Sequence, residues 1–280
     1  MGYLIMPARC DASDARPVPY AGDPALRTTT PGHTTLYPPL APARRCRHME
    51  VMNANTPPPL QAVIIPVTAL QQNCTLIWCT KTMRGAFTDP GGDIDRLMAV
   101  AEQHGVRIEK LLITHGHIDH CGLAGVLAER LGVPIEGPHP DDKFWIDQAP
   151  ATGAQYGIDG ATAFTPDRWL FQGDTVTVGD LTFDVYHCPG HTPGHVVFHH
   201  APSNLAIVGD VLFQGSIGRT DFPRGNHADL IASITTRLWP LGGETAFVPG
   251  HGPMSTFARE RQANAYVADR VLALDQVVNA

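Results

Sequence analysis

The stretch "ITHGHIDHCG", residues 113–122, places His115, His117, Asp119 and His120 within six consecutive positions. Neither a helix nor a strand needs that density of imidazole and carboxylate groups for packing. In an extended segment His115 and His117 project to the same side, so both rings can reach one metal ion. Asp119 and His120 follow where the chain turns into the next helix, and they can reach a second ion nearby. The stretch therefore predicts half of a metal site, and that site needs further ligands from elsewhere in the chain.

Three later segments can supply those ligands. "HCPGHTPGH" contains His191 directly after a strand-like run, "IVGD" ends in Asp210, and "FVPGHG" contains His251. Each lies at a transition from strand to loop, as the opening stretch does, and folds often present functional side chains there. Imidazole and carboxylate ligands suit Zn²⁺ and tolerate Fe or Mn. The four segments together predict a metal centre.

Taken one at a time, these residues have ordinary structural interpretations. Asp119 alone indicates the N-cap of a helix over 119–131, Asp210 a strand end, and His191 a hydrogen-bonded loop histidine. If all of these residues had only structural roles, the polar residues in the four segments would have to occur together by chance. The set therefore favours the metal site, and we expect capping to be the lesser role of Asp119.

Two neighbouring polar residues need separate interpretations. Asp89, in "TDPGG", is either a turn carboxylate or a partner that orients a ligand histidine. His195 follows His191 by four positions at the start of a predicted strand, and we interpret it as structural.

Apolar periodicity in the rest of the chain predicts an α/β fold. Runs rich in β-branched and aromatic residues predict strands at "AVIIPV", "CTLIWC", "GAFT", "KLLIT", "TVTV", "LTFDVYH", "HVVFHH", "LAIVG" and "TAFV". Helical spacing predicts helices over 93–105, 119–131, 227–239 and 255–271, with Asp93 and Asn226 at N-termini. Strands that partly form hairpins and partly alternate with helices fit a layered α/β sandwich.

The chain changes character near residue 59. Residues 1–59 contain 11 of the 25 prolines and show no sustained hydrophobic period. Such a segment cannot bury enough apolar surface to offset its chain entropy, so we predict a disordered extension. Met49 or Met52 as the true start is the favoured explanation of this segment. Residues 60–280 are predicted to form the folded domain.

Composition excludes several classes of partner. The formal charge of −7 argues against nucleic acid, which normally requires a basic face. No apolar run reaches the roughly 18 residues that span a bilayer. The six cysteines include no C-x-x-C pair, which indicates reduced thiols and a cytoplasmic protein.

The segments "THGHIDH", "PGHTPGH", "VGD" and "PGHG" resemble the ligand motifs of the metallo-β-lactamase superfamily, in the same order, over roughly residues 61–260. The resemblance implies a four-layer αββα sandwich with two divalent metal ions, Zn²⁺ favoured, at one edge of the sheets. It also implies a ligand set. One ion would be held by His115, His117 and His191, and the other by Asp119, His120 and His251, with Asp210 bridging both.

Within the superfamily, the flanks "PVTALQQNCTLIWC", "HCPGHTPGHVVF" and "GRTDFPRG" resemble the short bacterial glyoxalase II-like enzymes, the hydroxyacylglutathione hydrolases. The resemblance implies hydrolysis of small acyl thioesters, such as glutathione conjugates, by a metal-bridging hydroxide that Asp119 orients. Arg219 and Arg224 are candidates for binding a substrate carboxylate, and a loop salt bridge is the alternative role for both.

Other interpretations stay open. A persulfide dioxygenase of the same fold would hold one non-haem iron and shares a similar "GRTDF" loop. A lactonase would use the same hydroxide on another carbonyl, and a non-catalytic metal-binding module is the third alternative. Full-length glyoxalase II continues into a helical domain that grips glutathione, whereas 29 residues follow His251 here, so glutathione recognition is the open question.

Overall fold

Apolar runs that are buried on both faces, such as residues 72–79 and 205–209, form the central strands of two six-stranded sheets. The computed structural model describes residues 3–4 and 58–278. The first sheet has the order β1 (Tyr3–Leu4), β2 (Leu60–Val67), β3 (Gln72–Cys79), β4 (Arg84–Thr88), β5 (Arg107–Leu112) and β6 (Ile135–Glu136). The second has the order β14 (Ser255–Thr256), β13 (Ala246–Pro249), β10 (Leu205–Gly209), β9 (Val196–His200), β8 (Leu181–His187) and β7 (Thr175–Val178). Both sheets mix parallel and antiparallel pairs.

Short helices and one small hairpin connect these strands. The helices are α1 (Ile94–Gln103), α2 (Ile118–Cys121), α3 (Ala124–Leu131), α4 (Lys143–Asp147), α5 (Ala149–Tyr156), α6 (His227–Ser233), α7 (Phe257–Ala263) and α8 (Asp269–Val278). Shorter turns are the 3₁₀ helices η1 (Pro140–Asp142), η2 (Ala201–Ser203) and η4 (Trp239–Leu241), and the π-helical η3 (Ile234–Leu238). The hairpin consists of β11 (Leu212–Phe213) and β12 (Ser216–Ile217).

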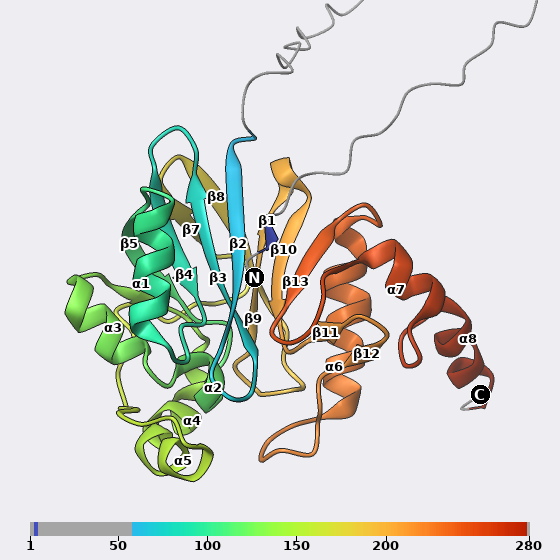
Figure 1. Ribbon diagram of the computed structural model, residues 1–280. Coiled ribbons are helices and arrows are strands. Elements are labelled where there is room, and N and C mark those ends of the chain that lie inside the picture. The colour runs from blue at the N-terminus through green and yellow to red at the C-terminus, as the bar shows by residue number, and fades with distance from the viewer. Residues whose placement is uncertain (1–2, 5–57, 279–280) are drawn as a thin grey trace, which may run out of the picture. The chain divides into compact units, whose positions relative to one another are not determined.

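Three apolar clusters separate four layers. Alternate side chains of both sheets meet between the sheets, including Ile77, Leu112, Phe183, Phe198 and Ile207. The opposite face of the first sheet packs against α1 and α3, and that of the second packs against α6 and α7 (Figure 1). Because successive strand residues point to opposite faces, each sheet can serve two clusters at once. The predicted αββα sandwich is confirmed.

The predicted helix over 119–131 is wrong in its continuity. It is divided into α2 and α3 at Gly122, whose carbonyl accepts a hydrogen bond from Thr162 N at 3.4 Å. Asp119 lies inside α2 and does not cap it, because the N-cap position belongs to His117. Glycine has a low helix propensity, which makes position 122 a suitable break.

The predicted helix over 255–271 is also interrupted. Residues 255–256 form β14, and the helical part divides at Asn264. The side-chain oxygen of Asn264 accepts from Tyr266 N at 2.9 Å, and this local bond competes with helix continuation. Asp93 precedes α1 as predicted, but its carboxylate accepts from Thr68 N at 3.0 Å and makes no capping bond.

Some predictions concern residues outside the described ranges. The disordered extension falls almost entirely on residues 5–57, so it and the boundary near residue 59 stay predictions. The residues described there include β1, which pairs antiparallel with β2. No helix among the described residues is long and apolar enough to cross a membrane. The four cysteines of the described part, Cys74, Cys79, Cys121 and Cys188, are buried and unpaired, and cytoplasmic localisation stays a prediction.

The layer between the sheets makes a prediction about stability. Phe183 is fully buried there, so Phe183→Ala is expected to lower the free energy of unfolding by about 3–5 kcal/mol. Phe171 is 50% exposed, and Phe171→Ala is expected to cost about 1 kcal/mol or less. Chemical denaturation of both variants measures the difference. Equal losses would contradict the assignment of this core.

Candidate metal centre

The candidate site lies where strands of both sheets end. His115 follows β5, His191 follows β8, Asp210 follows β10 and His251 follows β13. Hydrogen bonds between the sheets close this edge: Val196 N donates to the Thr114 carbonyl at 2.8 Å, and Asn73 N donates to the Gly250 carbonyl at 2.7 Å. Segments far apart in the sequence are thereby held side by side.

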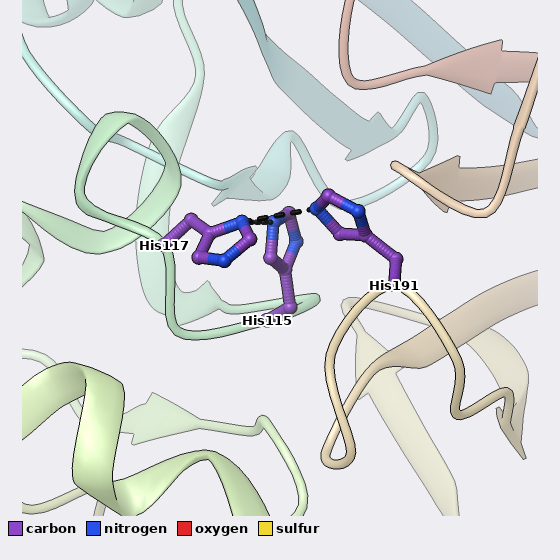
Figure 2. A group of neighbouring side chains, drawn as sticks. All are labelled: His115, His117 and His191. Atoms are coloured by element: carbon purple, nitrogen blue, oxygen red, sulfur yellow. Dashed lines mark hydrogen bonds between the residues drawn. The ribbon is translucent and has the colours of Figure 1, made fainter. Parts of the chain in front are cut away.

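Three histidines form the first group of candidate ligands. His117 Nδ1 lies 3.1 Å from His115 Nε2 and 3.0 Å from His191 Nε2. Figure 2 shows the three rings turned toward one another, with His115 and His117 on one loop and His191 on another. All three side chains are almost fully buried.

The hydrogen bonds of these rings determine where their lone pairs point. The Arg219 carbonyl can only accept, so His191 Nδ1 donates to it at 2.7 Å and His191 Nε2 carries a lone pair. Thr114 Oγ1 donates to Asp89 Oδ2 at 2.6 Å and therefore accepts from His115 Nδ1, at 3.1 Å. His115 Nε2 then also carries a lone pair. Because His117 Nδ1 can donate to only one of these two nitrogens, the arrangement fits a shared cation better than an internal network.

A second group lies beside the first. Asp119, His120 and His251 bring their ligand atoms close together, with His251 Nε2 3.1 Å from Asp119 Oδ2. His120 Nδ1 faces Asp89 Oδ2 at 3.0 Å, which turns its Nε2 toward the site. This buried His120 Nε2 has no hydrogen-bond partner, which fits a metal-ligating atom.

Asp210 lies between the two groups. Its Oδ1 is 3.3 Å from His120 Nε2, and its Oδ2 is 3.5 Å from His191 Nε2 and 3.8 Å from His251 Nε2. Its Oδ1 is buried without a hydrogen-bond partner. Oδ1 therefore faces the second group, and Oδ2 lies between His191 of the first group and His251 of the second. The buried histidine and aspartate clusters fit a binuclear centre.

Two neighbours hold Asp210 in this place. The backbone N–H of Asp210 donates to His195 Nε2 at 3.0 Å, and the His195 ring stacks on His115 with centroids 4.6 Å apart. His195 is thus a structural residue, as interpreted from the sequence, and it also supports two candidate ligands. At Gly250, a Cβ would lie 2.0 Å from Asp210 Oδ1, so only glycine lets this loop pass so close.

The electrostatics differ between the two groups. Burial and the neighbouring His191 lower the pKa of His117 to about 3, and burial also lowers the pKa of His115 and His191. Burial alone would lower the pKa of His120, but the negative charges of Asp210 and Asp119 raise it above its usual value. The neutral form that binds metal is therefore favoured in the first group, whereas a metal ion at His120 competes with a proton that the two carboxylates favour.

A further group outside the site has less suitable geometry. His139, Asp141 and His187 lie close enough to share an ion. The two imidazole rings stack, however, with centroids 4.2 Å apart and planes at 15°. Imidazole lone pairs lie in the ring plane, so those of two nearly parallel rings do not meet at one point.

A pocket of about 800 Å³ opens onto the centre. Its walls carry aromatic side chains, among them Trp145, Tyr156, Phe213 and Phe222. Arg219 is the one lysine or arginine that lines it among the described residues. Its guanidinium makes two hydrogen bonds to Asp221, at 2.9 and 2.8 Å, and lies 4.5 Å from the centroid of Phe222.

The two arginines singled out from the sequence are thus placed differently. Arg224 stacks on Phe144 at 4.1 Å and does not line the pocket. Arg219 lines the pocket with its hydrogen-bonding fork already occupied, as in the alternative loop salt bridge. A role of either arginine in binding a substrate carboxylate stays a prediction.

Sequence reasoning missed several residues that support the site. Gln72 is fully buried and lies 3.3 Å from His120 Nδ1, and Asn73 Nδ2 donates to the Pro249 and Gly252 carbonyls at 3.0 and 2.8 Å. Asp142 is a buried carboxylate beside the histidine loops, and Glu260 is a buried carboxylate beside the pocket wall. The adjacent polar pair in "QQNC", within a β-strand pattern, was the available signal. Asp142 and Glu260 carried none, because acidic residues are ordinarily exposed.

The comparison with protein families agrees with this geometry. The family model described as "Metallo-beta-lactamase superfamily" matches residues 67–251, which is more than half of the chain. The chain belongs to this superfamily. Its buried histidine and aspartate clusters are typical of the binuclear sites of this superfamily.

Individual relatives narrow the comparison. The hydroxyacylglutathione hydrolase GloC of Haemophilus influenzae is 44% identical over 205 residues, covering 73% of this chain and 96% of the relative. The structure described as BLEG-1 B3 metallo-beta-lactamase has a TM-score of 0.68 at 32% identity and covers 74% of this chain and 99% of its own. TTHA1623 in a di-iron-bound form has a TM-score of 0.66 at 33% identity, with 72% and 98% coverage.

The contacts of Asp89 predict a stability effect in the metal-free protein. The buried carboxylate accepts from Thr114 N at 2.7 Å, from Thr114 Oγ1 and from His120 Nδ1. Its φ of 56° lies in the left-handed region, so glycine removes the carboxylate without adding backbone strain. Asp89→Gly is expected to lower the free energy of unfolding by about 3–5 kcal/mol, because buried donors are left unpaired.

Urea denaturation without metal measures this effect. Asp89→Asn keeps one acceptor oxygen and tolerates the left-handed backbone, so its loss should be smaller. A loss below about 1 kcal/mol for Asp89→Gly would contradict the importance of these hydrogen bonds.

Proposed function

We propose that this protein is a hydrolase that binds two divalent metal ions and cleaves thioesters of the hydroxyacylglutathione type. The observation that carries the proposal is the position of Asp210 between two ligand groups at the base of the pocket. The 44% identity to a hydroxyacylglutathione hydrolase, over nearly all of that relative's length, supports the substrate class.

The two groups would divide the ions between them. In this proposal His115, His117 and His191 hold one ion, Asp119, His120 and His251 hold the other, and Asp210 joins both. The donor set of imidazole nitrogens and carboxylate oxygens favours Zn²⁺ and also accommodates Fe or Mn. Asp89 would orient His120 through its hydrogen bond to Nδ1.

Bound metal ions would lower the pKa of a water molecule and polarise the thioester carbonyl. The protein's own residues then orient the reactants. Asp119, whose side chain is largely buried beside His251, can accept a hydrogen bond from the attacking water. A thiolate is a good leaving group, so the reaction does not depend on a strong general acid in the pocket. Trp145 and Phe222, which pack against His117, shield the reacting carbonyl from bulk water.

The pocket can accommodate a glutathione conjugate by size, since it lies within the usual range for small-molecule sites. The pocket lining offers few groups that could bind a negative charge on the substrate. A substrate carboxylate would have to compete with Asp221 for the Arg219 guanidinium. We therefore expect a hydroxyacylglutathione to be held mainly by its acyl thioester and by aromatic contacts.

The proposal predicts two metal ions per chain and hydrolysis of S-lactoylglutathione. Elemental analysis measures the metal content, and thioester loss in steady-state assays measures the activity. Asp210→Ala removes the bridging carboxylate and should lose metal and lower kcat/KM by at least about 100-fold. Asp180→Ala alters a surface ion pair with Lys81 in the β7–β8 turn and should preserve both properties.

Three outcomes would contradict the proposal. One iron per chain with oxygen uptake on glutathione persulfide would identify a dioxygenase instead. Turnover of lactones but not thioesters would change the substrate class. Full activity of Asp210→Ala would exclude the bridging role.

The pKa directions predict unequal proton release on metal binding. Burial keeps the first group's histidines neutral at pH 7, so filling that group displaces no ligand proton. The pKa of His120 is raised by Asp210 and Asp119, so the second ion must displace a proton from it. Calorimetric Zn²⁺ titrations in two buffers of different ionisation enthalpy measure the release. We expect a larger release for the second equivalent, and equal release in both steps would contradict the assignment.

A further inference from the structure

A buried carboxylate outside both ligand groups connects the two loops that carry the first group. Asp142, at the end of η1, is completely buried. Its Oδ2 accepts from Gly116 N at 2.8 Å and from Thr192 Oγ1 at 2.7 Å, and its Oδ1 accepts from Gly194 N at 2.6 Å. Three donors from two separate loops therefore converge on one side chain.

The positions of these donors relate directly to the histidines. Gly116 separates His115 from His117 on the loop after β5, and Thr192 directly follows His191 on the loop after β8. These are the two loops that Figure 2 shows on either side of the three rings. Because β5 and β8 belong to different sheets, Asp142 joins the sheets beside the point where the ligand nitrogens meet.

The main chain approaches Asp142 more closely than most residues would allow. A Cβ at Gly194 would lie 2.5 Å from Asp142 N and 2.7 Å from its Cγ. A Cβ at Gly116 would lie 2.9 Å from the Asp142 carbonyl and 2.8 Å from Trp145 Cβ. The same segment binds the second loop through its backbone, since His139 N donates to the Gly194 carbonyl at 3.0 Å. Both glycines thus permit the hydrogen bonds that the carboxylate accepts.

A carboxylate is a costly group to place here. In the described part of the chain no ion pair includes Asp142, so its three neutral donors provide the compensation. Burial raises the pKa of Asp142 to about 6, so the cost of removing the charge from water is only partly offset. An acceptor-only side chain with two oxygens is nevertheless what three donors in this arrangement require.

We propose that Asp142 is a positioning residue that fixes the separation of the two histidine loops and thereby sets the metal affinity of the group His115, His117 and His191. The proposal rests on the metal-binding part of the proposed function. It does not depend on which substrate is cleaved. Asp142 itself touches neither the candidate ligands' metal-facing atoms nor the pocket.

The test compares Zn²⁺ binding by variants of the full-length chain. In Asp142→Asn, either orientation of the amide places an N–H against a backbone N–H, of Gly116 or of Gly194. We expect the Zn²⁺ affinity of the first group to fall 10–100-fold, as is typical when a residue supporting a ligand is lost. Chelator competition measures this affinity in a His251→Ala background, where the second group has lost a ligand.

Milder variants and a matched control complete the design. Thr192→Val removes one donor and keeps the carboxylate, so a smaller loss is expected, and Thr192→Ser should restore wild-type affinity. This pair carries the test if Asp142→Asn does not fold. Glu136→Gln neutralises another buried carboxylate, whose side chain pairs with Lys110 and Arg168 and not with the histidine loops. It should lower the unfolding midpoint and preserve Zn²⁺ affinity.

Two results would overturn the proposal. One is wild-type Zn²⁺ affinity in folded Asp142→Asn, or in Thr192→Val if the former does not fold. The other is an equal loss of affinity in Glu136→Gln, which would show that reduced stability alone weakens the site. If the wild-type protein binds two ions and cleaves no thioester, the proposed substrate class fails while the role of Asp142 is still measured by its affinities.

Discussion

The structure depends on holding three imidazole nitrogens together in a buried space, with His117 Nδ1 at 3.1 Å from His115 Nε2 and at 3.0 Å from His191 Nε2. Lone pairs repel, and burial removes the water that would otherwise separate them. The rings cannot relax, because the Arg219 carbonyl holds His191 and Thr114 holds His115. The rings of His191 and His115 are thus fixed by the nitrogen that faces away from the site. A shared cation is the simplest group that turns this repulsion into attraction.

The fold meets this requirement through its topology. Strand ends of two sheets meet at one edge, so ligands that are distant in sequence need only short loops to converge. These loops approach one another so closely that a side chain larger than glycine would not fit at Gly250 or Gly194. Hydrogen bonds between the sheets, from Asn73 to Gly250 and from Val196 to Thr114, prevent the edge from opening. The metal centre and the packing of the sandwich are therefore parts of one structure.

The layers could be predicted from local apolar patterns, whereas the division of the candidate ligands into two groups was implied by the resemblance to the metallo-β-lactamase superfamily. Continuous apolar and β-branched runs such as "AVIIPV" favour a strand, and packing does not explain four imidazole or carboxylate groups within six positions. Breaks within helices were harder to predict from the sequence. The division at Gly122 depends on Thr162, and that at Asn264 on a side-chain bond that no periodicity reveals. Supporting residues were the hardest to predict. Asp142, for example, accepts hydrogen bonds from residues 26 and 52 positions away in the sequence.

The pocket wall shows where specificity can vary while the centre stays constant. Glu260 of α7 is buried and accepts from Gly215 N at 2.7 Å, and Asn264 donates to the Ser216 carbonyl at 3.0 Å. The hairpin of β11 and β12, which lines the pocket, is thus held by the helix that follows the last candidate ligand. A change in α7 would alter the shape of the pocket without touching a histidine. Because the ligand groups are held by separate hydrogen bonds, substrate preference and metal chemistry can change independently in this fold.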